Sequence, residues 1–163
     1  MEVVPVDQIP TEVIDTPVEN LMDLYKVCQK MEKLCIEQNG IGISAVQVGL
    51  PWKFFIYNQD GEFRYMVDCE YEPLDEEKAV SIEGCLSLRD AAGPLRHFKL
   101  ERYRKVRVTG KRLVAGDDLL LADVDFVEED NIFGVVCQHE IDHHHGVLIS
   151  ELGEEIEIER LQG

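Results

Sequence analysis

The segment His139-Glu140-Ile141-Asp142-His143 restricts the possible folds of this 163-residue chain more than any other feature. Two histidines four residues apart can both reach one metal ion on a helix, because each residue turns the direction by about 100° and the rings then lie on one face. The intervening Glu140 can contact a water at that ion without being a ligand itself. The sequence therefore predicts a helix over residues 131–145 that ends at Gly146 and places both histidines on one face. HExxH also arises often by chance, so this segment alone does not establish a metal site.

A third ligand has to come from another part of the chain, because catalytic metal sites usually have three protein ligands and one open position. Cys85 is the best candidate, since Gly84 directly before it allows the backbone to approach closely. Cys137 lies on the opposite side of the predicted helix from the histidine pair. His144 and His145 also turn away from the pair, by roughly 140° and 240°, and are expected to be exposed or to lie in a second layer.

An N-terminal helix is predicted over residues 16–39. Thr16 can act as its N-cap, with Pro17 in the first position and Glu19 completing a capping box. The next apolar residues follow at steps of three and four and form one stripe: Leu21, Leu24, Cys28, Met31 and Cys35. The Asn39-Gly40 pair supplies the stop signal.

Short runs of aromatic and β-branched residues predict strands elsewhere. They cover residues 52–58, 63–69, 105–109 and 119–127, with a turn at Asp60-Gly61. The tail, residues 147–163, alternates at Ile156 and Ile158 and can add an edge strand. Helices separated by runs of strands indicate an α+β fold with mostly antiparallel sheets. We expect one catalytic domain over residues 1–163 with a short C-terminal tail.

The composition restricts the cellular location and the binding partners that we expect for this chain. The formal net charge of −17 argues against direct binding to nucleic acid or to an anionic membrane. No apolar stretch approaches the roughly 20 residues that cross a bilayer, and the first residues lack the features of a signal peptide. The five cysteines form no CxxC pair, so we expect reduced thiols, a cytoplasmic location and at least one thiolate available to a metal.

The segment from Gly40 to Gln47, with the sequence GIGISAVQ, is the third notable feature. Its glycines permit a close approach of the backbone to a ligand, and the amide of Gln47 can polarise a carbonyl. An ordinary helix-to-strand turn would be the better explanation of this segment if it stood alone.

Together the three segments resemble peptide deformylase. That family carries GxGΦAAxQ, EGCΦS and HEΦDH motifs in this order, where Φ is an apolar residue. Here they read Gly40-Ile41-Gly42-Ile43-Ser44-Ala45-Val46-Gln47, Glu83-Gly84-Cys85-Leu86-Ser87 and His139-Glu140-Ile141-Asp142-His143. The resemblance extends from the first helix to Gly146. It implies the α+β deformylase fold, with the HEΦDH helix packed centrally against the sheets.

The resemblance also implies an activity, which is removal of the formyl group from N-formyl-methionyl peptides or nascent chains with release of formate. One divalent ion would be held by Cys85, His139 and His143, with Fe²⁺ expected first and Zn²⁺, Ni²⁺ or Co²⁺ as alternatives. Metal-bound water would attack the formyl carbon with Glu140 as general acid and base. Gln47 and the backbone N–H of Leu86 would stabilise the oxyanion.

The residues that contact methionine follow partly from helical spacing. Ile132, Val135 and Val136 precede His139 by seven, four and three residues, which places them on the ligand face as an apolar wall. Plain core packing is the alternative for each of them. By resemblance, Ile41 closes the same pocket, beside Gly42.

Several departures from the family pattern are visible. Ser44 replaces an alanine, and His144 replaces a leucine. The arginine that orients the peptide has no direct counterpart, so Arg96 is our first candidate and Arg89 the second. The chain ends within 17 residues of Gly146, so ribosome docking through a C-terminal helix is not expected. We expect a monomer.

Two other functions are compatible with parts of the pattern. A zinc endopeptidase can also use HExxH, but such enzymes usually take a downstream histidine or glutamate ligand, and the EGCLS segment would stay unexplained. A catalytically inactive homologue would bind a metal without turnover, but it would need neither Glu140 nor Gln47.

Overall fold

The structure is a computed structural model that describes residues 1–89 and 93–158. The α-helices within these ranges are α1 (Leu21–Glu37), α2 (Ile132–His144) and the short α3 (Ile149–Leu152). Two 3₁₀ turns, η1 (Val6–Gln8) and η2 (Ala45–Val48), lie in the first third of the chain. The strands in these residues are β1 (Gly42–Ser44), β2 (Phe54–Gln59), β3 (Glu62–Pro73), β4 (Lys78–Arg89), β5 (Leu95–Tyr103), β6 (Lys105–Ala115), β7 (Leu119–Glu129) and β8 (Glu154–Ile156).

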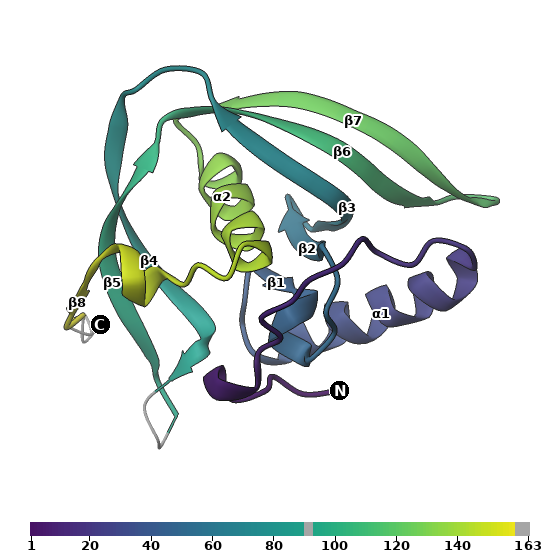
Figure 1. The fold of residues 1–163 in the computed structure, drawn as a ribbon, viewed down its shortest axis with the longest axis horizontal. Helices are drawn as coiled ribbons and strands as arrows, with labels where there is room; N and C mark the ends of the chain where they lie inside the picture. Colours follow the sequence, from purple (N-terminus) through teal and green to yellow (C-terminus); the bar gives the residue numbers. More distant parts are fainter. Residues whose placement is uncertain (90–92, 159–163) are drawn as a thin grey trace.

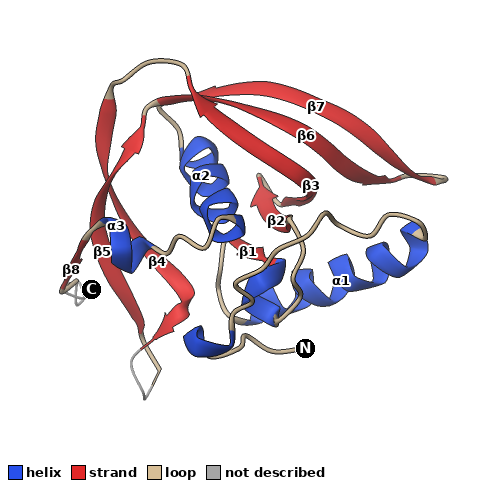
Figure 2. Ribbon diagram, viewed as in Figure 1, coloured by secondary structure: helices blue, strands red, loops and turns tan. Residues whose placement is uncertain are grey.

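The strands form two antiparallel sheets with α2 between them (Figures 1 and 2). One sheet has the order β1-β2-β3-β6-β7 and the other has the order β4-β5-β8. The pairing of β6 with β7 shows how the larger sheet uses its two faces. Leu113, which pairs with Leu121, packs in the apolar cluster that includes Leu24 and Met31 of α1 (the α1 core). Val108, which pairs with Phe126, packs in the apolar cluster that includes Cys137 and Ile141 of α2 (the α2 core). α2 is therefore enclosed by the faces of both sheets, in the interior of the molecule.

The apolar stripe predicted for the first helix is confirmed. Leu24, Cys28, Met31 and Cys35 are all buried against the larger sheet. The expected N-terminus at Thr16 is wrong, because the helix begins at Leu21 with Asn20 as its N-cap.

Thr16 has a different role from the expected one. It is buried, and both its backbone N–H and its hydroxyl donate to Oδ1 of Asp68 at 2.9 Å. The side-chain oxygen of Asn20 accepts the backbone N–H of Asp23 instead. Thr16 therefore makes a long-range contact to Asp68 of β3 and does not form the capping box that the local sequence pattern predicted.

The strand predictions are confirmed for β2, β3, β6 and β7, and the tail contributes β8 at the edge of the smaller sheet. Ile156 of β8 pairs with His97. Residues 159–163 of the predicted tail lie outside the described residues. β1, β4 and β5 were not predicted, and β4 lacks a clean alternation because it contains Glu83, Gly84 and Cys85 near its middle.

All five cysteines are buried and unpaired. Cys69 and Cys137 lie in the α2 core and pack there as small apolar side chains. None of the helices in the described ranges is both long and apolar enough to span a membrane.

Candidate metal centre

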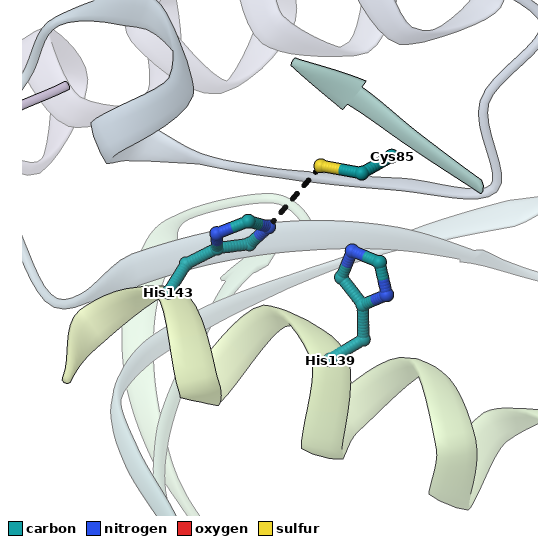
Figure 3. A group of neighbouring side chains, drawn as sticks. All are labelled: Cys85, His139 and His143. Atoms are coloured by element: carbon teal, nitrogen blue, oxygen red, sulfur yellow. Dashed lines mark hydrogen bonds between the residues drawn. The ribbon is translucent and has the colours of Figure 1, made fainter. Parts of the chain in front are cut away.

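The two histidines of α2 point from one face of the helix toward Cys85 (Figure 3). Their ring centroids are 5.1 Å apart. α2 begins at a defined point because Oδ1 of its N-cap, Asn131, accepts the backbone N–H of Gly134 at 2.9 Å. The cap sets the start of the helix two turns before His139, as the sequence predicted.

Cys85 reaches the centre from β4, at an irregularity in the smaller sheet. The ladder with β5 pairs Gly84 with His97 and resumes only at Arg89 with Leu95. The residues between these two pairs leave the regular register, and such bulges redirect side chains. A side chain on Gly84 would also meet the ring of His97 at 3.3 Å. These features explain why glycine precedes the cysteine.

The spacing of the three side chains fits one ion. Sγ of Cys85 is 3.7 Å from Nε2 of His143, and one ligand atom from each of the three residues lies within 4.8 Å of the others. Sulfur and nitrogen ligands of one tetrahedral ion are separated by about 3.5 Å, given metal–ligand bonds of about 2.3 and 2.0 Å. One thiolate and two imidazoles are also a common donor set for such ions. The chain can hold a single metal ion here.

Behind His139 lies a buried network that sequence reasoning missed. Nδ1–H of His139 donates to Glu83 at 2.8 Å, which leaves Nε2 directed to the centre. Arg102 donates two hydrogen bonds to Glu83, at 2.9 and 2.8 Å, and a third to Asp142 at 2.7 Å. Tyr71 donates to the second oxygen of Asp142 at 2.7 Å. A sequence signal existed for Glu83, which lies two residues before Cys85 and so shares its side of the strand.

These contacts determine the charges around the centre. Burial raises the pKa of Glu83, but the hydrogen bonds from Arg102 and His139 outweigh it and hold that pKa at about 2. Burial holds the pKa of His143 well below its ordinary value, so the ring is neutral, as a ligand must be. For His139 burial is outweighed by its hydrogen bonds to Cys85 and Glu83, which raise the pKa to about 10. The acidic groups that raise the pKa of His139 also favour a metal cation between Cys85, His139 and His143.

Glu140 and Gln47 approach this centre from two sides. Glu140 is buried, and its Oε1 is 3.8 Å from Nε2 of His139. Its Oε2 has no hydrogen-bond partner in residues 1–89 and 93–158, and burial raises the pKa of the carboxyl to about 7. Nε2 of Gln47 is 3.4 Å from Sγ of Cys85. Leu86 follows Cys85 within the register shift of β4 between Gly84 and Arg89.

A cavity of about 520 Å³ opens over the centre. Its walls include Cys85, His139, Glu140 and Gln47, together with all five apolar or glycine residues predicted to contact methionine: Ile41, Gly42, Ile132, Val135 and Val136. The structure therefore brings these residues together, while their contact with a substrate stays a prediction. His97 also lines the cavity, and sequence reasoning gave no reason to select it.

Comparison with known proteins agrees with this geometry. Residues 3–157 match the model of the polypeptide deformylase family. The chain belongs to the peptide deformylase family. Over 132 residues it is 33% identical to a peptide deformylase of Helicobacter pylori, a match that covers 77% of this chain and 69% of that protein. It is 31% identical over 153 residues to a peptide deformylase of Acidothermus cellulolyticus, with 91% and 77% covered.

The fold is that of the peptide deformylases as well. The crystal structure of the Thermotoga maritima peptide deformylase is similar, with a TM-score of 0.75 and 26% identity, and the match covers 94% of this chain and 95% of that chain. The expected α+β deformylase fold, with a central helix that carries the two histidines, is thus confirmed.

The departures from the deformylase pattern have distinct structural settings. The hydroxyl of Ser44 donates to the carbonyl of Phe54 at 3.4 Å. His144 is buried against Phe55, with ring centroids 5.8 Å apart, and burial lowers its pKa to about 4. His145 is exposed and lies 2.8 Å from Glu70. Neither histidine joins the metal centre, as expected from their helical directions.

Neither candidate arginine lines the cavity in the described part of the chain. Arg96 forms a two-bond ion pair with Glu155 of β8, at 3.0 and 2.8 Å, and stacks over the ring of Phe98. Arg89 donates to Gln38 and to the carbonyl of Gly93. Whether either arginine orients a peptide stays a prediction.

Proposed function

We propose that this chain is a metal-dependent hydrolase that removes the formyl group from N-formyl-methionyl peptides. The observation that carries the proposal is the convergence of Cys85, His139 and His143 with Glu140 and Gln47 at one cavity. Membership in the peptide deformylase family supports the same activity.

Cys85, His139 and His143 would hold one divalent ion. When bound, such an ion supplies Lewis acidity, which lowers the pKa of water and polarises a carbonyl oxygen. We propose Fe²⁺ as the native ion, with Zn²⁺, Ni²⁺ and Co²⁺ able to occupy the same donors. The thiolate and imidazole donors suit all four of these ions.

Glu140 moves the proton in the proposed reaction. It accepts a proton from the attacking water as the new bond to the formyl carbon forms, and it later donates that proton to the departing amine nitrogen. The bond between the formyl carbon and the nitrogen breaks, so the products are formate and a peptide with a free N-terminal methionine. The unpartnered Oε2 of Glu140, buried beside the ligands, supports this role.

Gln47 and Leu86 would stabilise the negative charge that develops on the formyl oxygen. The side-chain amide of Gln47 already lies on the Cys85 side of the cavity, and the backbone N–H of Leu86 follows directly after Cys85. Loss of one such donor typically costs about 10²–10³ in kcat.

The apolar wall is suited to an unbranched thioether side chain. The cavity beside the centre is lined by Ile41, Ile132, Val135 and Val136. Gly42 leaves space in this wall, since a Cβ atom at position 42 would lie only 3.3 Å from Val136. We propose that methionine occupies this wall with its formyl group at the metal centre.

We propose that the substrates are formylated peptides or nascent chains in the cytoplasm, and that the chain takes part in N-terminal processing during protein biosynthesis. We further propose that it acts as a monomer and binds no nucleic acid directly. The net charge of −17 supports the second point, because it repels phosphate.

The proposal is tested by measuring formate release from formyl-Met-Ala with protein loaded anaerobically with Fe²⁺. The wild type should release formate, and Glu140→Gln should retain one metal per chain while losing at least about 10² in kcat. Glu129→Gln, on the exposed end of β7, is the matched control and should keep wild-type turnover. Unchanged turnover in Glu140→Gln would contradict the assigned role.

The same assay separates the alternatives. Hydrolysis of an internal bond in an acetylated peptide, without formate release, would identify a zinc endopeptidase. One bound metal without hydrolysis of either substrate would identify a binding-only homologue.

A further inference from the structure

The side-chain amide of Gln47 has a defined orientation in this structure. The backbone N–H of Ser44 donates to Oε1 of Gln47 at 2.8 Å. A backbone N–H can only donate, so the atom that faces it has to be the carbonyl oxygen of the amide and not its nitrogen. The opposite side of the amide, with both of its hydrogens, therefore faces β4.

Two acceptors on β4 meet this nitrogen. Nε2 of Gln47 donates to the hydroxyl of Ser87 at 3.0 Å and to Sγ of Cys85 at 3.4 Å. Cys85 and Ser87 are two residues apart on β4, and the contacts to Gln47 show that both side chains face its amide. Both hydrogens of the amide are thus occupied.

The two acceptors are not equivalent. The hydroxyl of Ser87 accepts at 3.0 Å, an ordinary hydrogen-bond distance, whereas Sγ of Cys85, at 3.4 Å, is the proposed ligand atom and shares its electron pairs with the ion when one is bound. The N–H that faces Cys85 is therefore the one that can exchange its partner for an oxygen at the metal centre, while the N–H that faces Ser87 remains bonded.

We propose that Ser87 is a positioning residue, whose hydroxyl holds the Gln47 amide so that its second N–H faces the formyl oxygen. This inference rests on the proposed function, in which Gln47 stabilises the oxyanion. The terminal torsion of a glutamine side chain has a broad preference, so contacts rather than rotamer energy have to fix the amide plane. Ser44 fixes the oxygen end of that plane, and Ser87 fixes the nitrogen end.

Kinetics with formyl-Met-Ala test the proposal. Ser87→Ala should lower kcat about 3- to 10-fold, with KM within about twofold, because one hydrogen bond that acts in the transition state becomes less well aligned. Ser87→Thr retains a hydroxyl and should restore kcat to within about twofold of the wild type. Ser150→Ala, an exposed serine of α3, is the control and should leave kcat unchanged.

The decisive measurement is a double-mutant cycle. If Ser87 acts through Gln47, then Ser87→Ala should change kcat less than about twofold in the Gln47→Ala background. The same 3- to 10-fold loss in that background would overturn the proposal, because Ser87 would then act without Gln47. An unchanged kcat in the Ser87→Ala single variant would overturn it too.

A readout without turnover separates this proposal from the proposed function. In ¹⁵N spectra of the metal-free protein, the Gln47 amide pair is identified as the pair that Gln47→Ala removes. Ser87→Ala should speed hydrogen exchange of that pair at least about 10-fold, whereas Ser87→Thr should not. Unchanged exchange in Ser87→Ala would overturn the positioning role even if the wild type releases formate. Faster exchange in Ser87→Ala, together with a wild type that releases no formate, would contradict only the proposed function.

Discussion

At the scale of single residues, Arg102 is the cation that balances the acidic groups under the metal centre. It is buried and bonds to both Glu83 and Asp142. Arg102→Met would leave two carboxylates without their partner, so we expect it to lower the free energy of unfolding by about 3–5 kcal/mol. Because Glu83 orients His139, metal affinity should also fall about 10- to 100-fold. Urea unfolding and metal competition with a chelator measure the two effects.

Arg107→Met is the matched control, because Arg107 also pairs with a carboxylate, that of Asp125, but on the exposed face of β6 and β7. Solvent screens this pair, so we expect no measurable change in the urea midpoint or in metal affinity. Similar losses in both variants would mean that the buried network has no special role at the metal centre.

The sequence was sufficient to select the metal ligands but not the network behind them. His139 and His143 followed from helical spacing, and Cys85 followed from the glycine before it. Glu83 and Arg102 meet only because β4 pairs with β5, a pairing that no local pattern indicated. His97 was missed for the same reason, because it enters the cavity from the strand beside Gly84.

At the scale of elements, the N-cap of α2 connects helix stability to the cavity. Oδ1 of Asn131 accepts the N–H of Gly134, and the turn that follows carries Ile132 and Val135 of the cavity wall. Asn131→Ala should cost about 1 kcal/mol of stability and should raise KM for formyl-Met-Ala a few-fold, with little change in kcat. Steady-state kinetics and urea unfolding measure both quantities.

Asn20→Ala removes the equivalent cap of α1, where Asn20 accepts the N–H of Asp23 at 3.2 Å. We expect a similar loss of stability without a change in KM, because Asn20 and Asp23 do not line the cavity. An equal rise of KM in both variants would show that global destabilisation, and not the cavity wall, controls substrate binding.

The elements themselves were predictable where apolar residues repeat regularly or where aromatic and β-branched residues form runs. The stripe of α1 repeats at steps of three and four, such runs located the strands β2, β3, β6 and β7, and the spacing of the histidines located α2. The start of α1 was not predictable, because Thr16 is a good local cap but makes a long-range bond to Asp68. β4 was missed because the irregularity between Gly84 and Arg89, which directs Cys85 to the centre, also removes the regular alternation. β5 does alternate in burial, but one of its buried positions is the charged Arg102, so the apolar alternation in its sequence is short.

At the scale of the whole molecule, the metal centre joins two layers. The histidines belong to the helix between the sheets, and Cys85 belongs to the smaller sheet (Figures 1 and 3). Neither layer can complete the donor set alone. A bound ion should therefore protect Cys85 and link β4 to α2, and this can be followed through the reactivity of the thiols.

The thiols should respond to metal in a residue-specific way. Burial raises the pKa of Cys35 and of Cys69 to about 12, and it raises the pKa of Cys28 and Cys137 further, so these four thiols should stay unreactive in the folded protein. Cys85 lines the cavity instead.

We expect iodoacetamide at pH 8 to modify Cys85 alone in the metal-free protein, no cysteine in the loaded protein, and all five in concentrated urea. Peptide mapping by mass spectrometry identifies the sites, and Cys85→Ser is the control that should abolish labelling of the folded protein. Equal labelling of Cys85 with and without metal would contradict its role as a ligand.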